Sequence, residues 1–467
     1  MKKRAILLIG VLFLIGCQAA FPVLKPTLEE EGEVYLYLQP FPQEAERLRF
    51  TLGAIYAIGL DGVEHPLSMI SLPELKASEL RRQRFLASGL LPPGSYVGLS
   101  FKVNQAMLKS AEGEASLLVP EAPVRIDFPF NVSRRQASVF SLILKYTESI
   151  PDGFSFNPVF TLFIPAKPVP SLVGYVTNYG SNNITVFDKK TGQVAAVIPT
   201  GRGPAGMSLD QKARRAYVAL PEDDAIELID VTSGEIVDRI RLNPGDHPQE
   251  LALSPDGKVL LSINAGTNTA SIIDPFSLIE LTRINVENGP SSVLIDSTGK
   301  RAFVFNSLSS TVSVIDIPNQ AILTTISTDP APLRGQFNRK GDRLYIIHER
   351  SSYLTILDPA SLTVLARAPV KMGMSSIKVD ILTDLIYTGR RRDIRVEVYD
   401  PFTIVPFYSI RTGGGITYMT IDSEENNLYM VNPEMKRLEI SNLVSRRVVS
   451  EIDVGEGPYW VTLMGER

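Results

Sequence analysis

The chain has very few of the residues that build reactive centres. Its 467 residues include one cysteine, three histidines and one tryptophan. A single cysteine excludes an internal disulfide, a thiolate metal site and a CxxCH haem attachment. The histidines form no HExxH or other close pair, so a histidine zinc site would require three distant loops to converge. With no Gly-x-Ser-x-Gly elbow and no phosphate-binding fingerprint in a strand–turn–helix setting, we predict no catalytic residue, no metal and no cofactor.

An excess of basic residues is also lacking. The chain has 47 lysines and arginines against 51 acidic residues, a formal net charge of −4. Nucleic-acid binding requires a basic face, so nucleic acid is excluded as a partner. Hydrophobic residues make up 44% of the chain, which is typical of a globular protein, and the length predicts two or three domains.

The N-terminus has the pattern of an export signal. Lys2-Lys3-Arg4 precedes an apolar run at 5–15 that is too short to span a bilayer as a helix, and Cys17 follows. Residues 14–17 (Leu-Ile-Gly-Cys) resemble the lipobox of bacterial lipoproteins, which implies a signal peptide at 1–16 and a lipid anchor on Cys17. The alternative is a secretory leader with a chance cysteine. Gln18 in the next position implies the outer membrane of the cell envelope, by the rule for lipoproteins of enteric type.

Short alternating runs follow a predicted tether at 17–32. The segments 34–38, 96–103, 124–132, 139–146 and 154–164 are rich in β-branched and aromatic residues and read as strands. Only 71–85 has a helical pattern, with Ser71 and Glu74 as a capping box. We therefore expect an antiparallel β-sandwich at 33–164, followed by a proline-rich linker at 165–170. A Leu-Pro-x-Gly-x-Tyr stretch at 91–96 and an Asn-Pro stretch at 156–159 resemble a sandwich domain of unknown function in other bacterial lipoproteins.

A repeat fills the remainder of the chain, 171–467. Apolar-x-apolar-x-Asp segments end at Asp188, Asp230, Asp274, Asp316, Asp358 and Asp400, with Asn442 in the seventh place. The spacing of about 42 residues is the period of a propeller blade, and each unit holds four short strands, which we name A to D outward from the axis. The sequence therefore predicts an all-β fold with a seven-bladed β-propeller.

The Tyr-Val-Thr-Asn tetrapeptide at 175–178 and Gly203-Pro204 resemble the repeat of the YVTN family. Met374 and Ile416 depart from that repeat by replacing the proline of Pro204. Because the chain enters the propeller at a B strand and ends in an A-type strand at 458–463, we expect a three-plus-one closure in which the last strand completes the first blade.

The repeated aspartates and glycines have structural interpretations. An aspartate at the end of a C strand can accept hydrogen bonds from turn N–H groups. The glycines at 203, 289, 373, 415 and 457 precede A strands, where a positive φ is the expected reason for them. His247 replaces glycine at this position, which makes it a candidate functional residue.

One face of the ring is the candidate binding surface. In an up-and-down blade the D–A and B–C connections emerge on the same face, and loops on a rigid scaffold are where binding residues concentrate. Residues two places after the A-strand proline are expected at the channel mouth on this face. The candidates from both groups are Arg202, His247, Glu250, Arg334, His348, Arg350, Arg390, Arg391, Arg392, Arg411, Tyr418 and Trp460.

Two functions remain open from the sequence. The first is a membrane-anchored lipoprotein that binds or scaffolds an envelope protein or polysaccharide through this loop face. The alternative is a propeller enzyme of lactonase or dehydrogenase-subunit type, as the fold resemblance allows, with Glu250, His247 and Arg334 as its candidate set. The lack of catalytic motifs favours the first.

Overall fold

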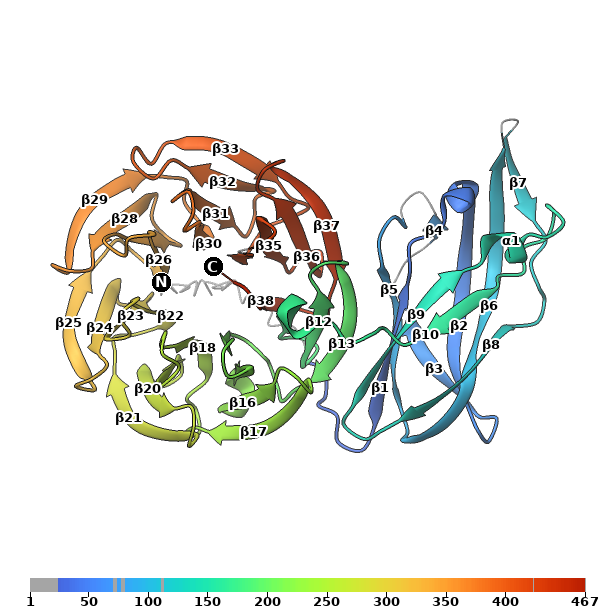
Figure 1. The fold of residues 1–467 in the computed structure, drawn as a ribbon, viewed down its shortest axis with the longest axis horizontal. Helices are drawn as coiled ribbons and strands as arrows, with labels where there is room; N and C mark the ends of the chain where they lie inside the picture. The colour runs from blue at the N-terminus through green and yellow to red at the C-terminus, as the bar shows by residue number, and fades with distance from the viewer. Residues whose placement is uncertain (1–23, 70–73, 77–79, 111–112, 423, 467) are drawn as a thin grey trace, which may run out of the picture.

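The computed structural model describes residues 24–69, 74–76, 80–110, 113–422 and 424–466, so the predicted leader and Cys17 lie outside the described residues. The chain is all-β and has two bodies side by side, a ring of blades and an elongated sheet structure (Figure 1). Helical turns are few and short: η1 (Gln43–Arg47), α1 (Tyr146–Ser149), η2 (Pro170–Leu172) and η3 (Pro221–Asp223). No helix among the described residues has the length and apolar character needed to cross a bilayer.

The N-terminal strands form one continuous sheet in the order β10-β9-β1-β5-β3-β2-β6-β7, with β4 on β2 and β8 on β6. The strands are β1 (Gly32–Leu38), β2 (Leu48–Gly59), β3 (Glu64–Met69), β4 (Leu75–Lys76), β5 (Arg84–Leu91), β6 (Gly94–Ser110), β7 (Gly113–Leu117), β8 (Val124–Val132), β9 (Ala137–Leu144) and β10 (Phe160–Phe163). The pairing of β1 with β9 is parallel, whereas the other pairs are antiparallel. The sheet is therefore antiparallel, as expected, except for this one parallel pair.

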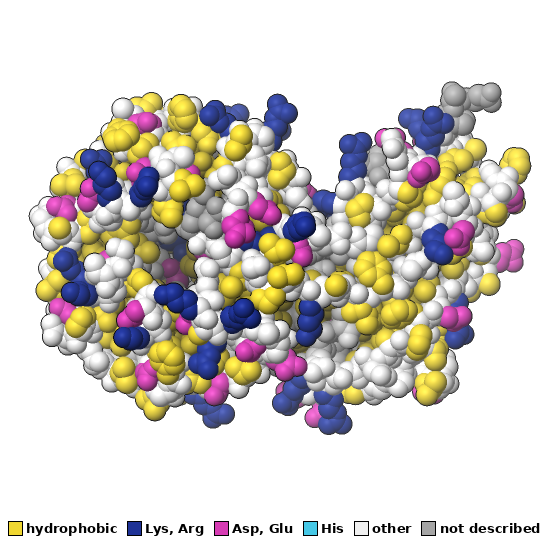
Figure 2. All heavy atoms as spheres, viewed as in Figure 1, with side chains coloured by type: hydrophobic (Ala, Val, Ile, Leu, Met, Phe, Trp, Pro, Cys, Tyr) yellow, Lys and Arg dark blue, Asp and Glu magenta, His cyan; other side chains and the backbone are white. Residues whose placement is uncertain are grey.

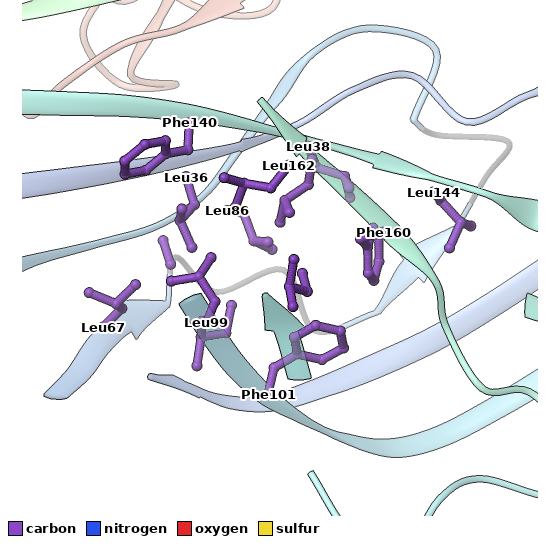
Figure 3. Close-up of a cluster of buried hydrophobic side chains, with 14 of the residues drawn as sticks. Leu36, Leu38, Leu67, Leu86, Leu99, Phe101, Phe140, Leu144, Phe160 and Leu162 are labelled. Atoms are coloured by element: carbon purple, nitrogen blue, oxygen red, sulfur yellow. The ribbon is translucent and has the colours of Figure 1, made fainter. Parts of the chain in front are cut away.

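This sheet surrounds a single apolar core. Strand β3 pairs with both β5 and β2, which continues the sheet from one half into the other. Leu36 and Phe140 enter the core from one half, and Leu99 and Phe101 enter it from the other (Figure 3). All four side chains are at most 3% exposed, so the two halves are held by burial of apolar surface.

The helix predicted at 71–85 is wrong where the structure describes it. Leu75–Lys76 forms β4 and pairs with β2, and β5 (Arg84–Leu91) begins within the predicted helix. Leu75 is 2% exposed beside Phe50, so burial in the sheet outweighs a helical propensity that is worth only tenths of a kcal/mol per residue.

The ring consists of seven four-stranded sheets, as the repeat predicted. Blade 1 contains β11, β12, β13 and β38, and blades 2 to 7 are, in order, β14–β17, β18–β21, β22–β25, β26–β29, β30–β33 and β34–β37. The A strands are β14 (Met207–Asp210), β18 (Pro248–Leu253), β22 (Pro290–Ile295), β26 (Pro332–Phe337), β30 (Met374–Val379), β34 (Tyr418–Ile421) and β38 (Pro458–Leu463). The B strands are β11 (Val173–Asn178), β15 (Arg215–Leu220), β19 (Leu260–Asn264), β23 (Arg301–Asn306), β27 (Leu344–His348), β31 (Ile386–Arg390) and β35 (Asn427–Asn432). The C strands are β12 (Asn183–Asp188), β16 (Ala225–Asp230), β20 (Thr269–Asp274), β24 (Thr311–Asp316), β28 (Tyr353–Asp358), β32 (Arg395–Tyr399) and β36 (Arg437–Asn442). The D strands are β13 (Gln193–Pro199), β17 (Glu235–Arg241), β21 (Ile279–Asn285), β25 (Ala321–Ser327), β29 (Thr363–Pro369), β33 (Pro406–Arg411) and β37 (Arg447–Asp453).

The predicted three-plus-one closure is confirmed. Blade 1 has the order β13-β12-β11-β38, so the last strand supplies its innermost member. Trp460 N donates to Thr177 Oγ1 at 3.1 Å across this pairing. Lys189 Nζ, in the turn after β12, lies 2.6 Å from the buried carboxylate of Asp422, which follows β34 in blade 7, and adds an ion pair across the junction.

The repeated aspartates have the predicted structural role. Asp188 Oδ1 accepts from Thr191 N at 2.9 Å, and Asp230 Oδ1 accepts from Ser233 N at 2.7 Å. The same contact is made to Ser445 N by Asn442 Oδ1 at 2.9 Å in the seventh blade. These side chains fix C–D turns and do not converge on a site.

The glycines that precede A strands also have a structural role, because they allow backbone conformations that other residues rarely adopt. Gly203, Gly289, Gly373 and Gly457 have φ values between +60° and +82°. Gly415 is an exception: its φ is not left-handed, but a Cβ there would lie 1.7 Å from the Arg391 carbonyl oxygen. At the equivalent positions His247 and Ala331 adopt the same left-handed φ, +49° and +58°, without being glycine.

The N-terminal sheet packs on the outer strands of blades 7 and 1, the two blades that meet at the closure. Tyr35, Tyr37 and Phe85 share an apolar cluster with Val194 and Val197 of β13. From blade 7, Asp453 accepts from Arg84 Nε at 2.7 Å and from Arg82 Nη1 at 3.1 Å. The N-terminal sheet therefore spans the seam of the ring.

Candidate functional site

The channel of the ring is crossed by side chains two places after the A-strand proline, as expected from the two-residue period of a strand. Glu250 Oε2 lies 2.6 Å from Arg334 Nη1, and Ser292 Oγ donates to Glu250 Oε1 at 2.7 Å. The side chains of Glu250 and Arg334 are only 5% and 12% exposed. Three separate blades thus contribute to one buried polar contact.

Two aromatic rings complete this layer. Tyr418 and Trp460 stack with their centroids 3.6 Å apart, and the Arg334 guanidinium lies 5.1 Å and 4.9 Å from their ring centres. A cation over an aromatic face is attracted by the ring quadrupole. One residue before Trp460, the Tyr459 hydroxyl donates to Gln249 Oε1 at 3.0 Å. The structure therefore brings Glu250, Arg334, Tyr418 and Trp460 together.

A cavity of about 350 Å³ extends from this layer, and it does not open where the sequence placed it. Its lining includes Gln211 and Pro255, which follow β14 and β18, and Glu466, which follows β38. These residues belong to the A–B ends of the blades, opposite the D–A and B–C connections. The expectation that the four residues line a mouth on the loop face was therefore wrong: they form the floor of a cavity that faces the other side. Figure 2 shows a hollow at the centre of the ring.

Burial sets the electrostatics of the floor. Burial raises the pKa of Glu250, while the Arg334 charge and the Ser292 hydroxyl lower it. With both carboxylate oxygens already bonded, the Glu250 carboxylate is occupied by its neighbours. No group of three or more histidine, cysteine or acidic residues in the described ranges has a metal-binding arrangement.

The acidic loop on the loop face is neutralised by arginines. Asp223 Oδ1 lies 2.6 Å from Arg202 Nε, and Asp223 Oδ2 lies 2.6 Å from Arg239 Nη2. His247 is exposed nearby, with Nδ1 2.8 Å from the Pro221 carbonyl oxygen. Its backbone N–H donates to Asp224 Oδ1 at 2.8 Å, so Arg202 and His247 both serve to hold this loop.

His348 is not on the surface, contrary to the expectation. It is 1% exposed, and Nδ1 lies 3.2 Å from the Tyr353 carbonyl oxygen. Because a carbonyl oxygen only accepts hydrogen bonds, Nδ1 carries the proton of the neutral ring. Nε2 is therefore unprotonated, and it has no hydrogen-bond partner among the described residues. Burial lowers the pKa of His348 to about 4.

Arginines gather at the loop-face end of blade 6. Arg390 pairs with Asp393, whereas Arg391 and Arg392 are exposed in the same turn. Arg395 and Arg411 lie opposite each other in the β32–β33 pairing. We call Arg391, Arg392, Arg395 and Arg411 the blade-6 arginine cluster. Within the described part of the chain, none of these four has a carboxylate oxygen within 4 Å, and the exposed Arg350 of blade 5 has none either.

The cavity residues that lie beyond the floor, towards the A–B ends of the blades, were not identified from the sequence: Lys378, Thr462 and Glu466. Lys378 and Thr462 lie four places after the start of their A strands and share the channel face with the floor residues. The two-residue period could have identified both. Glu466 has no such signal, because it follows the last strand.

No protein-family model and no curated protein matches the chain. Solved structures with a similar fold include a hydrazine synthase chain of Kuenenia stuttgartiensis, 18% identical, with a TM-score of 0.53 over 58% of this chain and 93% of that one. Another is a functionally unknown protein from Desulfotomaculum acetoxidans DSM 771, 14% identical, with a TM-score of 0.56 over 62% of this chain and 98% of that one. At these identities the likeness shows the propeller fold alone.

Proposed function

We propose that this chain is an exported lipoprotein with YVTN-type repeats, anchored through Cys17, that binds an anionic envelope partner, a protein or a polysaccharide, through the blade-6 arginine cluster. The observation that carries the proposal is the lack of carboxylate neighbours for these four exposed arginines in the described structure. Like charges directly opposite in a sheet are destabilising, so Arg395 and Arg411 are a poor choice for blade stability. A partner carboxylate or other anion would compensate them, and the planar guanidinium suits bidentate pairing.

The position of the N-terminal segment supports a membrane-proximal partner. Lys25 N donates to the Gly180 carbonyl oxygen at 3.0 Å, in the B–C turn of blade 1, on the loop face. The eight residues from Cys17 to Lys25 can span at most about 29 Å. A lipid anchor on Cys17 would thus hold the loop face within about 30 Å of the membrane.

The test of the binding surface is Arg391→Ser combined with Arg392→Ser, which leaves the Arg390–Asp393 pair intact. Surface changes cost within about 0.5 kcal/mol, so thermal unfolding should be almost unchanged. Capture of envelope partners by crosslinking should weaken, and the wild-type interaction should fall with added salt. Arg339→Ser with Lys340→Ser is the matched control, because it removes an exposed basic pair from an A–B turn on the opposite face. Equal loss in both variants, or in neither, would contradict the proposal.

The anchor has a separate test. Cys17→Ser should release the protein from membranes washed at high salt. A variant that remains in the membrane fraction would show that retention does not depend on acylation, without bearing on the arginine cluster.

The enzyme alternative finds less support in the geometry. Its candidate set would need Glu250, His247 and Arg334 to converge, but the His247 ring contacts Pro221 in a loop, and Glu250 is bonded to Arg334 and Ser292 in the channel.

A further inference from the structure

The cavity holds a second ionic contact beyond the Glu250–Arg334 floor. Glu466 Oε2 accepts from Thr462 Oγ1 at 2.8 Å, and Glu466 Oε1 accepts from Thr420 Oγ1 and lies 3.5 Å from Lys378 Nζ. The Glu466 carboxylate thus contacts two hydroxyl groups and one ammonium group, which come from three different A strands. The surroundings of this carboxylate are those of a bound carboxylate ligand.

The receptor groups are buried, and the carboxylate is the more accessible partner. Thr420, Thr462 and Lys378 are 0%, 3% and 8% exposed, whereas the Glu466 side chain is 23% exposed. Glu466 follows β38 and lies outside the named strands, where its backbone forms an isolated bridge with Asp422. Its side chain can leave the cavity by rotation about its own bonds while this backbone bridge stays in place.

The charges of the cavity select a monoanion. Among the described residues, four charged side chains line it, and Glu250 and Arg334 neutralise each other. If Glu466 left, Lys378 would remain as a buried and uncompensated cation, which is strongly unfavourable. A group that replaces Glu466 must therefore carry one negative charge.

We propose that this cavity binds a small hydroxylated monocarboxylate of the sugar-acid class, and that the Glu466 side chain occupies its carboxylate subsite in the ligand-free protein. A volume of about 350 Å³ lies at the small end of ligand sites. Ser208, Gln211 and Gln336 also line the cavity and offer hydrogen bonds to ligand hydroxyls. The inference is independent of the blade-6 arginine cluster, which lies on the opposite face.

Glu466→Gln tests the inference directly, with D-glucuronate as the probe and neutral D-glucose as its matched control. A tethered group competes at an effective concentration of about millimolar or higher. Removing its charge should therefore lower the Kd for glucuronate, measured by calorimetry, by about tenfold or more relative to the wild type. Glucose should bind neither protein.

The double variant Lys378→Met/Glu466→Gln keeps the cavity neutral and so keeps the fold testable by thermal unfolding. It should lose glucuronate binding. The inference is overturned if Glu466→Gln fails to bind glucuronate, if its affinity equals that of the wild type, if glucose binds equally well, or if the double variant retains binding. Arg391→Ser with Arg392→Ser should leave glucuronate binding unchanged, which separates this site from the proposed loop-face function.

Discussion

At the scale of single residues, His348 makes stability depend on pH. Its folded pKa of about 4 lies below the ordinary value of 6.5, so the unfolded chain binds more protons between these limits. The contribution of the neutral His348 ring to the unfolding free energy is present in full above about pH 6.5 and is lost as the pH falls towards 4. We expect a loss of about 3 kcal/mol in unfolding free energy across this window from this residue.

His348→Asn should flatten that part of the profile, measured by urea unfolding at pH 4.5 and pH 7. His247→Asn, which replaces an exposed imidazole, is the control for the general effect of removing a histidine. A profile that is unchanged by His348→Asn would show that the buried ring is not its source.

Some features of the cavity could be predicted from the sequence and others could not. Glu250, Arg334, Tyr418 and Trp460 could be grouped because each occupies the same place in its repeat, two residues after the A-strand proline or its replacement. The direction in which the cavity opens could not be predicted, because it depends on the size of side chains that meet across the channel, such as Tyr459 and Gln249. The burial of His348 was hidden for a similar reason: it ends a B strand, where the sequence alone does not separate strand from loop.

At the scale of elements, the ring depends on β38. Val461 and Leu463 are fully buried, and burial of one such side chain contributes about 1.5–3 kcal/mol. A chain that ends at Gly457 would lose these contacts and expose the inner edge of β11. We expect it to unfold at a much lower temperature than the intact chain, or to aggregate, in a thermal unfolding experiment read by circular dichroism. An unchanged midpoint would show that the ring does not need β38 to close.

Whole blades could be predicted from the sequence, whereas in the N-terminal sheet single strands could be predicted but their pairing could not, for a physical reason. Each of blades 2 to 7 is formed by four consecutive strands, so its pattern is local and repeats. In the N-terminal sheet β1 pairs with β5 and β9, and β2 pairs with the distant β6. The two-residue strand β4 exists only through its contact with β2, which explains why 71–85 read as a helix.

At the scale of the whole molecule, Asp453 links the two bodies. It lies within 3.3 Å of Arg82, Arg84 and Arg437 and also accepts from Phe85 N at 3.0 Å. Asp453→Asn would leave three arginines close together with reduced compensation, and we expect a loss of about 3 kcal/mol in unfolding free energy. The linker at 165–170 should also become easier to cleave in limited proteolysis, because the sheet would separate from blades 7 and 1 more often.

Glu451→Gln is the matched control, since Glu451 contacts Arg82 and Arg437 but is 29% exposed. A pair of that kind is worth about 1 kcal/mol or less. Equal destabilisation by the two variants would show that the contact with Asp453 is not special.

The closure of blade 1 also determines when the molecule can be completed. The hydrogen bond between Thr177 and Trp460 cannot form until Trp460, 283 residues later in the chain, is available. As the chain emerges from its N-terminus into the compartment where it folds, blades 2 to 7 can form in order, while the first blade stays open until the last strand arrives. Contacts of such large sequence separation slow folding and prolong the exposure of an unpaired edge. The first blade to begin is therefore the last to be finished, and the inner edge of β11 stays unpaired until the last strand of the chain is available.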